Sequence, residues 1–149
     1  MPTVTRQDVS RTIAQLMPWI LQGIQLDFFV KKGVTQTQFL ILMVLHASES
    51  CTMSALASNL HVKMPTATGI VDRLVRLGYV QRVTDSHDRR QVFVSLTTKG
   101  RAFIRDFQHV VRRRWEEVLR TLTAKELDMF HHVLTTLHQQ LRAGQHDAR

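Results

Sequence analysis

The sequence predicts a mainly α-helical chain with one small β-hairpin. Apolar residues recur at intervals near 3.6 in several long stretches, the spacing that gives a helix one buried face. Two short β-type stretches, 79–84 and 91–96, flank the polar turn DSHDRR, and the second of them alternates apolar and polar residues. With 149 residues, 44% of them hydrophobic, the chain has the length of one domain and can fold without a disulfide or a metal.

The N-terminal stretch predicts two helices. Over residues 8–31 the apolar positions follow helical spacing, and Pro18 falls inside that pattern, where it should kink the helix. Thr35 followed by Gln38 is a capping box, which opens a second helix over residues 36–47. Apolar residues occupy most faces of this second helix, so we expect it at the centre of the core.

Two short helices follow, joined by a tight turn. We expect a short strand over residues 51–53 and a small helix over residues 55–60 that Ser54 caps. In the next helix Pro65 occupies the first turn, where its missing N–H does no harm. Gly78 is expected to end that helix as a C-cap glycine.

After the hairpin the pattern predicts two long helices, 98–120 capped by Thr97 and 124–143 opened by a capping box at Thr123. The apolar positions of the last helix are spaced 3, 4, 3, 4, as in a coiled-coil seam. Because this seam is too apolar to stay exposed on a monomer, it predicts a homodimer interface, assisted by the N-terminal part of the first helix. The seam residues are Leu127, Phe130, Leu134, Leu137 and Leu141.

Positive charge is concentrated in the middle of the chain. The 20 Lys and Arg exceed the 12 Asp and Glu by eight. Residues 63–114 hold twelve basic and four acidic residues, so this stretch carries the whole excess. A basic block in an otherwise neutral chain is typical of a protein that binds a polyanion, the alternative being a solvated basic face.

The helix pair and the hairpin together predict a winged helix-turn-helix. In that arrangement the second helix of the pair enters the major groove of DNA, and the first crosses the phosphate backbone. Arg89 and Arg90 at the hairpin tip would reach an adjacent minor groove, whose negative potential attracts guanidinium groups. Since this unit coincides with the basic block, the sequence predicts double-stranded DNA as the partner.

Two stretches, MPTATGIVDRLVRLGYVQR and SHDRRQVFVSLTTKG, resemble the MarR family of bacterial transcription regulators. The resemblance covers about residues 10–142, and its motifs are Asp72-Arg73-Leu74, Gly78-Tyr79-Val80, Asp88-Arg89-Arg90 and Leu96-Thr97-Thr98-Lys99-Gly100. It implies that residues of the recognition helix meet base edges or phosphates, that Arg89 enters the minor groove, and that Arg73 contacts phosphate or pairs with Asp88 to hold the wing. The residues it assigns to DNA are Lys63, Met64, Thr66, Thr68, Arg73, Arg76, Asp88, Arg89 and Arg90.

The resemblance also implies a small-molecule ligand. The family commonly binds aromatic or phenolic acids between the dimer helices and the DNA-binding lobe, which makes Trp19, His46 and Trp115 candidate pocket residues. Plain core packing is the alternative for such large side chains.

Other chemistry is not expected. The sequence holds no catalytic motif, so we expect neither enzyme activity nor a cofactor. His131 and His132 are adjacent and would point about 100° apart on a helix, which disfavours a shared metal ion. Cys51, the single cysteine, is expected to be buried and structural rather than a redox switch.

We therefore expect one compact domain in three parts: a dimerisation helix in 1–34, a winged helix-turn-helix lobe in 35–100 and C-terminal helices in 101–149. The longest apolar run is too short to span a membrane and no secretory signal is present, so we expect a cytoplasmic protein. The expected function is that of a homodimeric regulator, a repressor at a pseudo-palindromic operator. The alternatives are a sequence-indifferent architectural DNA-binding protein and a metal- or redox-sensing module.

Overall fold

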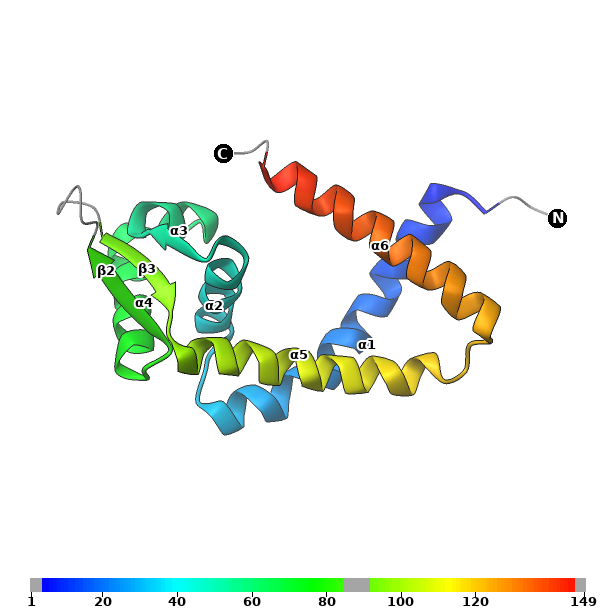
Figure 1. The fold of residues 1–149 in the computed structure, drawn as a ribbon, viewed down its shortest axis with the longest axis horizontal. Coiled ribbons are helices and arrows are strands. Elements are labelled where there is room, and N and C mark those ends of the chain that lie inside the picture. The colour runs from blue at the N-terminus through cyan, green and yellow to red at the C-terminus, as the bar shows by residue number, and fades with distance from the viewer. Residues whose placement is uncertain (1–3, 85–91, 147–149) are drawn as a thin grey trace. The chain divides into compact units, whose positions relative to one another are not determined.

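The computed structural model describes residues 4–84 and 92–146, with the side chains of 20–27, 142 and 144–146 left out (Figure 1). The fold is mainly helical with one small sheet, as predicted. Residues 1–111 form one compact unit and residues 112–149 a second. The elements are α1 (Arg6–Lys32), α2 (Gln36–Ser48), β1 (Ser50–Thr52), α3 (Met53–Asn59), α4 (Met64–Arg76), β2 (Val80–Thr84), β3 (Val92–Leu96), α5 (Thr98–Leu119) and α6 (Ala124–His146).

The two predicted capping boxes are confirmed. At the start of α2 the Thr35 hydroxyl accepts the Gln38 N–H, and Gln38 Oε1 accepts the Thr35 N–H at 2.9 Å. At the start of α6 the carboxylate of Glu126 accepts the Thr123 N–H at 2.8 Å. This backbone bond lowers the pKa of Glu126, so the contribution of the box to stability is lost as the pH falls through that lowered pKa.

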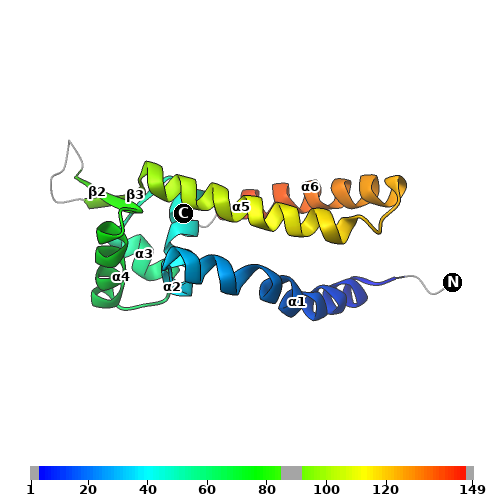
Figure 2. The ribbon, with the colours of Figure 1, turned by 90° about the horizontal axis from the view of Figure 1, so that it is seen from below.

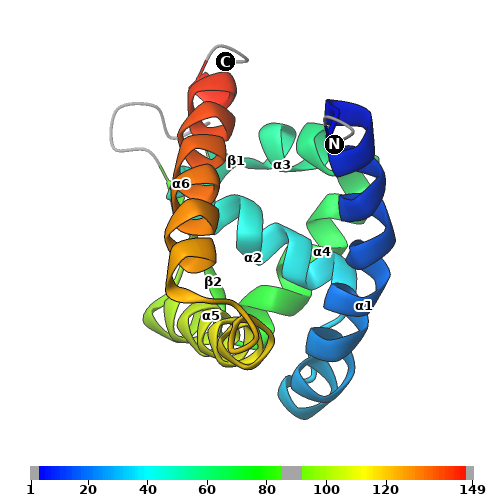
Figure 3. The same ribbon diagram turned by 90° about the vertical axis from the view of Figure 1, so that its right-hand side faces the viewer.

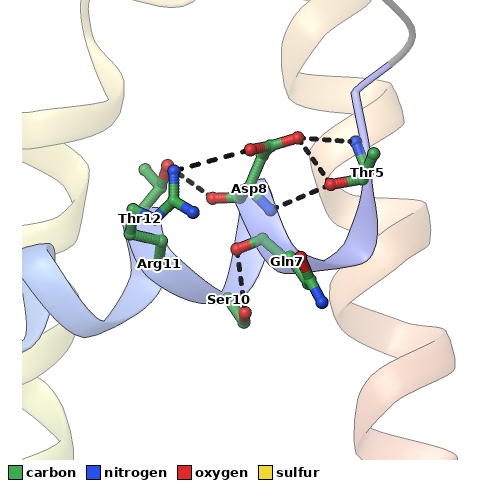
Figure 4. A network of polar contacts seen from close by, with 6 residues as sticks. All are labelled: Thr5, Gln7, Asp8, Ser10, Arg11 and Thr12. Carbon is green, nitrogen blue, oxygen red and sulfur yellow. Dashed lines mark hydrogen bonds and ion pairs between the residues drawn. The ribbon is translucent and has the colours of Figure 1, made fainter.

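α1 begins with a third capping box, which we did not predict (Figure 4). The carboxylate of Asp8 accepts hydrogen bonds from the hydroxyl and the N–H of Thr5, and these two bonds lower the pKa of Asp8. The helix continues through Pro18 and ends at Gly33, where a φ of 64° places the backbone in the left-handed region.

The predicted cap of α3 is wrong. The helix begins at Met53, and its cap is Thr52 rather than Ser54, since Thr52 Oγ1 accepts the Ala55 N–H at 3.2 Å. Thr52 is also the last residue of β1, where it lies opposite Phe93 of β3. Strand pairing holds Thr52 in the extended conformation that an N-cap needs, and this fixes where α3 begins.

The hairpin belongs to a three-stranded antiparallel sheet with the order β1-β3-β2. β2 and β3 pair as predicted, with Val80 opposite Leu96, and α4 packs beside β2 (Figure 2). The pairing of β1 with the other edge of β3 was not predicted. Cys51, in β1, is half-buried and packs against the core rather than being fully buried, because its strand lies at the sheet edge.

α2 lies at the centre of the core, as predicted. Ile41, Leu42 and Leu45 are fully buried, and the helix contacts α3, α4 and β3 (Figure 3).

An aromatic cluster joins the end of α1 to α2 and α5. Phe28 and Phe29 of α1 pack with Phe39 of α2 and with Phe103 and Phe107 of α5, and the Phe39 and Phe107 ring centroids lie 4.6 Å apart. Offset and tilted ring pairs of this kind add to the free energy gained by burial alone.

The apolar stripe of α5 is buried only near the start of the helix. Phe103 and Ile104 are buried, whereas Val118, near its end, is 51% exposed. The core that buries the first part of the stripe is that of the first unit, which ends at Val111.

The start of α5 approaches the start of β2 so closely that Gly100 has no room for a side chain. A Cβ on Gly100 would overlap the backbone carbonyl of Tyr79 and press on the Leu96 side chain. The glycine therefore permits the packing of the long helix against the sheet.

Gly100→Ala should destabilise the fold by about 1–3 kcal/mol, because either α5 or the Tyr79 backbone must move. Urea denaturation measures this change. Arg105→Ala, at an exposed position of the same helix, is the control and should change the free energy of unfolding by less than about 0.5 kcal/mol. A Gly100→Ala protein as stable as wild type would contradict the tight approach.

Candidate nucleic-acid interface

α3 and α4 form a helix-turn-helix. The turn between them is closed by two backbone bonds, from the His61 N–H to the Ser58 carbonyl and from the Val62 N–H to the Ala57 carbonyl, both at 3.0 Å. His61 has a φ of 52°, in the left-handed region that residues other than glycine rarely adopt. This turn fixes where α4 begins relative to α3.

α4 has one buried and one exposed face. Ala67, Val71 and Leu74 are fully buried against the core. The side chains predicted to meet DNA lie elsewhere on the helix, and Thr68 among them is half-buried; the exposed ones are Lys63, Met64, Thr66, Arg73 and Arg76. Because the inner face is locked into the core, the direction in which the outer face points is fixed.

Thr66, Gly69, Arg73 and Arg76 follow one another at intervals of three, four and three residues along α4. This spacing places them on one line along the helix surface, and all four are exposed. We call this line the outer stripe.

Thr68 lies beside the outer stripe, and its hydroxyl is engaged within the helix. Thr68 Oγ1 donates to the Met64 carbonyl at 2.9 Å. The proton of this hydroxyl cannot be donated to a ligand without breaking that bond.

An ion pair joins α4 to the wing. A guanidinium nitrogen of Arg82 in β2 lies 2.7 Å from a carboxylate oxygen of Asp72 in α4, and the two side chains are 36% and 41% exposed. A pair this exposed contributes little to stability, but it holds the middle of β2 against α4. We did not predict it; the two residues are ten positions apart, and only the strand direction brings them together.

The predicted wing residues Asp88, Arg89 and Arg90 lie outside the described residues, and so does the expected pair between Arg73 and Asp88.

The C-terminal end of α4 is held at a junction with β2 and α5. Gly78, with a φ of 76°, donates its N–H to the Val75 carbonyl, and Tyr79 donates its N–H to the Leu74 carbonyl. These two bonds form a Schellman motif, which confirms the predicted glycine stop. Lys99 Nζ donates to the Leu77 carbonyl at 2.7 Å and lies 4.8 Å from the centre of the Tyr79 ring.

Thr97 is the centre of this junction. Its N–H donates to the Tyr79 carbonyl at 3.0 Å, and its hydroxyl donates to the Gly78 carbonyl at 2.6 Å. The same hydroxyl accepts the Gly100 N–H at 3.0 Å and so caps α5. Thr97 therefore binds the end of α4, the residue before β2 and the start of α5.

Comparison with known proteins identifies the family. The MarR family profile matches residues 34–92. The chain is 31% identical over 116 residues to the HTH-type transcriptional repressor YetL of Bacillus subtilis, and the match covers 76% of this chain and 70% of that protein. It is also 31% identical over 109 residues to the multiple antibiotic resistance protein MarR of Escherichia coli, covering 72% and 76%. The chain belongs to the MarR family.

Solved structures confirm the winged-helix fold of this MarR-family chain. A transcriptional regulator from Thermotoga maritima superposes with a TM-score of 0.80 at 24% identity, covering 93% of this chain and 97% of the other. Because its relatives are transcription regulators, the protein is a MarR-family transcription regulator, in keeping with the expectation that it is not an enzyme.

Of the three candidate ligand residues of this regulator, Trp19 and His46 belong to the first unit and Trp115 to the second. Trp19 on α1 is 74% exposed, and His46 on α2 is exposed, with its Nε2 3.4 Å from Nε2 of Gln108 on α5. Trp115 is half-buried and belongs to the second unit.

In the second unit the predicted seam of α6 is largely exposed. Leu127 is 38% exposed and Leu141 is 72% exposed, while Phe130 is half-buried. Leu134 and Leu137 fall between them at 46% and 49%.

No group of three side chains suited to metal binding occurs among residues 4–84 and 92–146. Within the same ranges, no helix is long and apolar enough to cross a membrane.

Thr97→Val should destabilise the protein by about 1–2 kcal/mol, because the variant keeps the shape of the side chain but loses both the cap of α5 and the bond to Gly78. Thr97→Ser keeps the hydroxyl and is the control. Urea denaturation of the two variants separates the contribution of the hydroxyl to the free energy of unfolding from that of the side-chain shape. Equal stability of the Val and Ser variants would exclude the proposed role of Thr97.

Proposed function

We propose that this MarR-family protein is a homodimeric repressor, which binds a pseudo-palindromic operator in double-stranded DNA and leaves it when a small aromatic or phenolic ligand binds. The observation that carries this proposal is the outer stripe of α4, an exposed line with two arginines on a helix whose opposite face is fixed in the core. A helix presented in this way can enter a major groove without rearranging the core.

Phosphate and base contacts divide along α4. Arg73 and Arg76 lie on its C-terminal half, where guanidinium groups suit phosphate oxygens. Lys63, Met64 and Thr66 lie at its start, the part of a recognition helix that contacts base edges.

The wing supplies a second contact. Arg89 and Arg90 belong to the segment that links β2 to β3, and β2 is tied to α4 by Asp72 and Arg82. Major-groove and minor-groove contacts are then coupled, because α4 and the base of the wing are held as one piece. The fold accepts such a partner: S. aureus MepR, with a TM-score of 0.64 at 22% identity, is known bound to an oligodeoxyribonucleotide.

The dimer follows from exposed apolar surface. The α6 seam is largely exposed, and so are Ile13, Leu16 and Met17 of α1, each of which is at least 41% exposed. A monomer rarely leaves apolar surfaces of this kind in water. A twofold dimer would present two copies of α4 to successive major grooves.

The ligand is the least specified part of the proposal. NadR, which shares the fold with a TM-score of 0.60 at 23% identity, is known in complex with 4-hydroxyphenylacetate. The homoprotocatechuate degradative operon repressor of Escherichia coli is 28% identical over 104 residues, covering 70% of each chain. Both names point to phenolic acids, and Trp19, His46 and Trp115 offer aromatic and hydrogen-bonding groups to such a ligand.

Leu137→Glu should convert the dimer to a monomer at micromolar concentration, because a charge would be buried in the seam. Gln139→Glu adds the same charge to the opposite side of α6 and should leave the dimer intact. Light scattering measures the mass of both variants. A wild-type protein that is monomeric at this concentration would refute the dimer.

DNA affinity should depend steeply on salt. If a dimer neutralises about 6–10 phosphates, its affinity should fall by roughly 10³–10⁵ between about 50 and 200 mM salt. Fluorescence anisotropy on labelled duplexes gives the slope, and a nearly flat slope would mean that the basic block does not meet DNA.

Arg76→Ala and Arg89→Ala should differ in what they weaken. Arg76→Ala should lower affinity for specific and random duplexes alike and reduce the salt slope by about one, as the loss of a phosphate contact does. Arg89→Ala should cost about 1–3 kcal/mol on the specific duplex and narrow its advantage over random DNA. If Arg89→Ala lowers the affinity for both duplexes equally, the wing contacts only phosphate and does not contribute to sequence specificity.

A further inference from the structure

Gly69 lies in the middle of α4, and nothing within the described chain explains why it is a glycine. The structure describes the surroundings of Gly33, Gly69, Gly78 and Gly100. Gly33 and Gly78 have positive φ, and Gly100 abuts the Tyr79 backbone. Gly69 has a φ outside the left-handed region, and a Cβ added to it would have no neighbour within 4 Å.

A glycine at such a position weakens the protein. In a helix interior, glycine is less favourable than alanine because the unfolded chain loses more conformational freedom on folding. Neither close packing nor backbone conformation offsets this loss at Gly69. Among the described residues nothing requires a bare backbone at this point, whereas a partner that approaches it closely would.

The neighbours of Gly69 indicate what approaches it. Gly69 is exposed at the centre of the outer stripe, between Thr66 and Arg73. It is thus the one position of the outer stripe where no side chain would separate the helix backbone from the major groove of a bound DNA. Thr66 and Arg73 reach outward on either side, so the missing side chain leaves a shallow gap between them.

We propose, building on the DNA-binding function above, that Gly69 is the point where α4 approaches the base edges of the major groove most closely, and that it takes the C5-methyl group of a thymine. The methyl is the apolar group that a base presents in this groove. Hydrogen-bond reading is disfavoured here, since Gly69 has no side chain and the adjacent Thr68 hydroxyl donates to Met64. The exposed, apolar Met64 lies one turn before Thr68 on the same side. Gly69 is then a specificity-determining residue, because its missing side chain leaves room for the thymine methyl group.

The test compares Gly69→Ala with Val75→Ala. Val75 is 37% exposed on α4 but lies off the outer stripe, and alanine also suits a helix better than valine does. The probes are a duplex that the wild-type protein selects from a random-sequence pool and an unselected duplex of equal length. Thermal denaturation and anisotropy titrations are recorded for all three proteins.

Gly69→Ala should raise Tm by roughly 2–4 °C, because the helix is strengthened and nothing is crowded. Its affinity for the selected duplex should fall about tenfold, and its affinity for the unselected duplex should stay within about twofold of wild type. Val75→Ala should leave both affinities within about twofold of wild type.

The methyl group is tested by replacing each thymine of the selected duplex in turn with deoxyuridine. The wild-type protein should lose about fourfold in affinity at one thymine of each half-site, the loss expected for one buried methyl. Gly69→Ala should show no further loss at that thymine.

Unchanged binding of Gly69→Ala to the selected duplex would overturn the inference and leave the proposed function standing. Equal weakening on both duplexes would also overturn it, because the helix would then approach the phosphate backbone rather than base edges. A deoxyuridine scan without effect on the wild-type protein would exclude the thymine methyl. A wild-type protein that selects no sequence at all would overturn the proposed function together with the inference.

Discussion

The bond between the Thr97 N–H and the Tyr79 carbonyl is the point on which the presentation of α4 depends. Around it, the Thr97 hydroxyl holds the Gly78 carbonyl and caps α5, and Gly100 lets α5 come close enough for these bonds to form. The last turn of α4, the residue that precedes β2 and the first turn of α5 are therefore fixed together. Lys99 closes the junction by binding the Leu77 carbonyl. The motif L-T-T-K-G therefore has a structural role, which is to position α4.

The rest of the interface follows from this fixed junction. With Ala67, Val71 and Leu74 buried, α4 cannot rotate about its axis, so its outer stripe has one direction. The pair between Asp72 and Arg82 then sets the wing beside that stripe. Most of the stability comes from burial in the core, whereas the exposed ion pair sets orientation. In the proposed function this face is already formed before DNA binds, which keeps the conformational cost of binding low.

Local chemistry predicted much of the fold, and long-range geometry accounts for what was missed. The capping boxes at Thr35 and Thr123 and the end of α4 at Gly78 could be predicted from the sequence. In each case the residues that form the motif lie within one helical turn of the helix end that they determine. The cap at Thr52 could not be predicted, since it depends on strand pairing with β3 forty residues later in the sequence. The contact between Gly100 and Tyr79 could not be predicted either, because the two residues are far apart in the sequence and meet only in the folded chain. At the interface, the exposed α4 residues were predicted from periodicity and resemblance, whereas the partners of Asp72 and Thr97 emerge only when the sheet is assembled.

The central claim is that two copies of a rigid α4 read two halves of a symmetric DNA site. Hydroxyl-radical footprinting on a fragment that carries the sequence selected by the protein tests this most directly. The account predicts bounded, twofold-symmetric protection, with half-site centres about 10 base pairs, or a multiple of one helical turn, apart. Uniform protection along the whole fragment would contradict it and would favour a sequence-indifferent architectural protein.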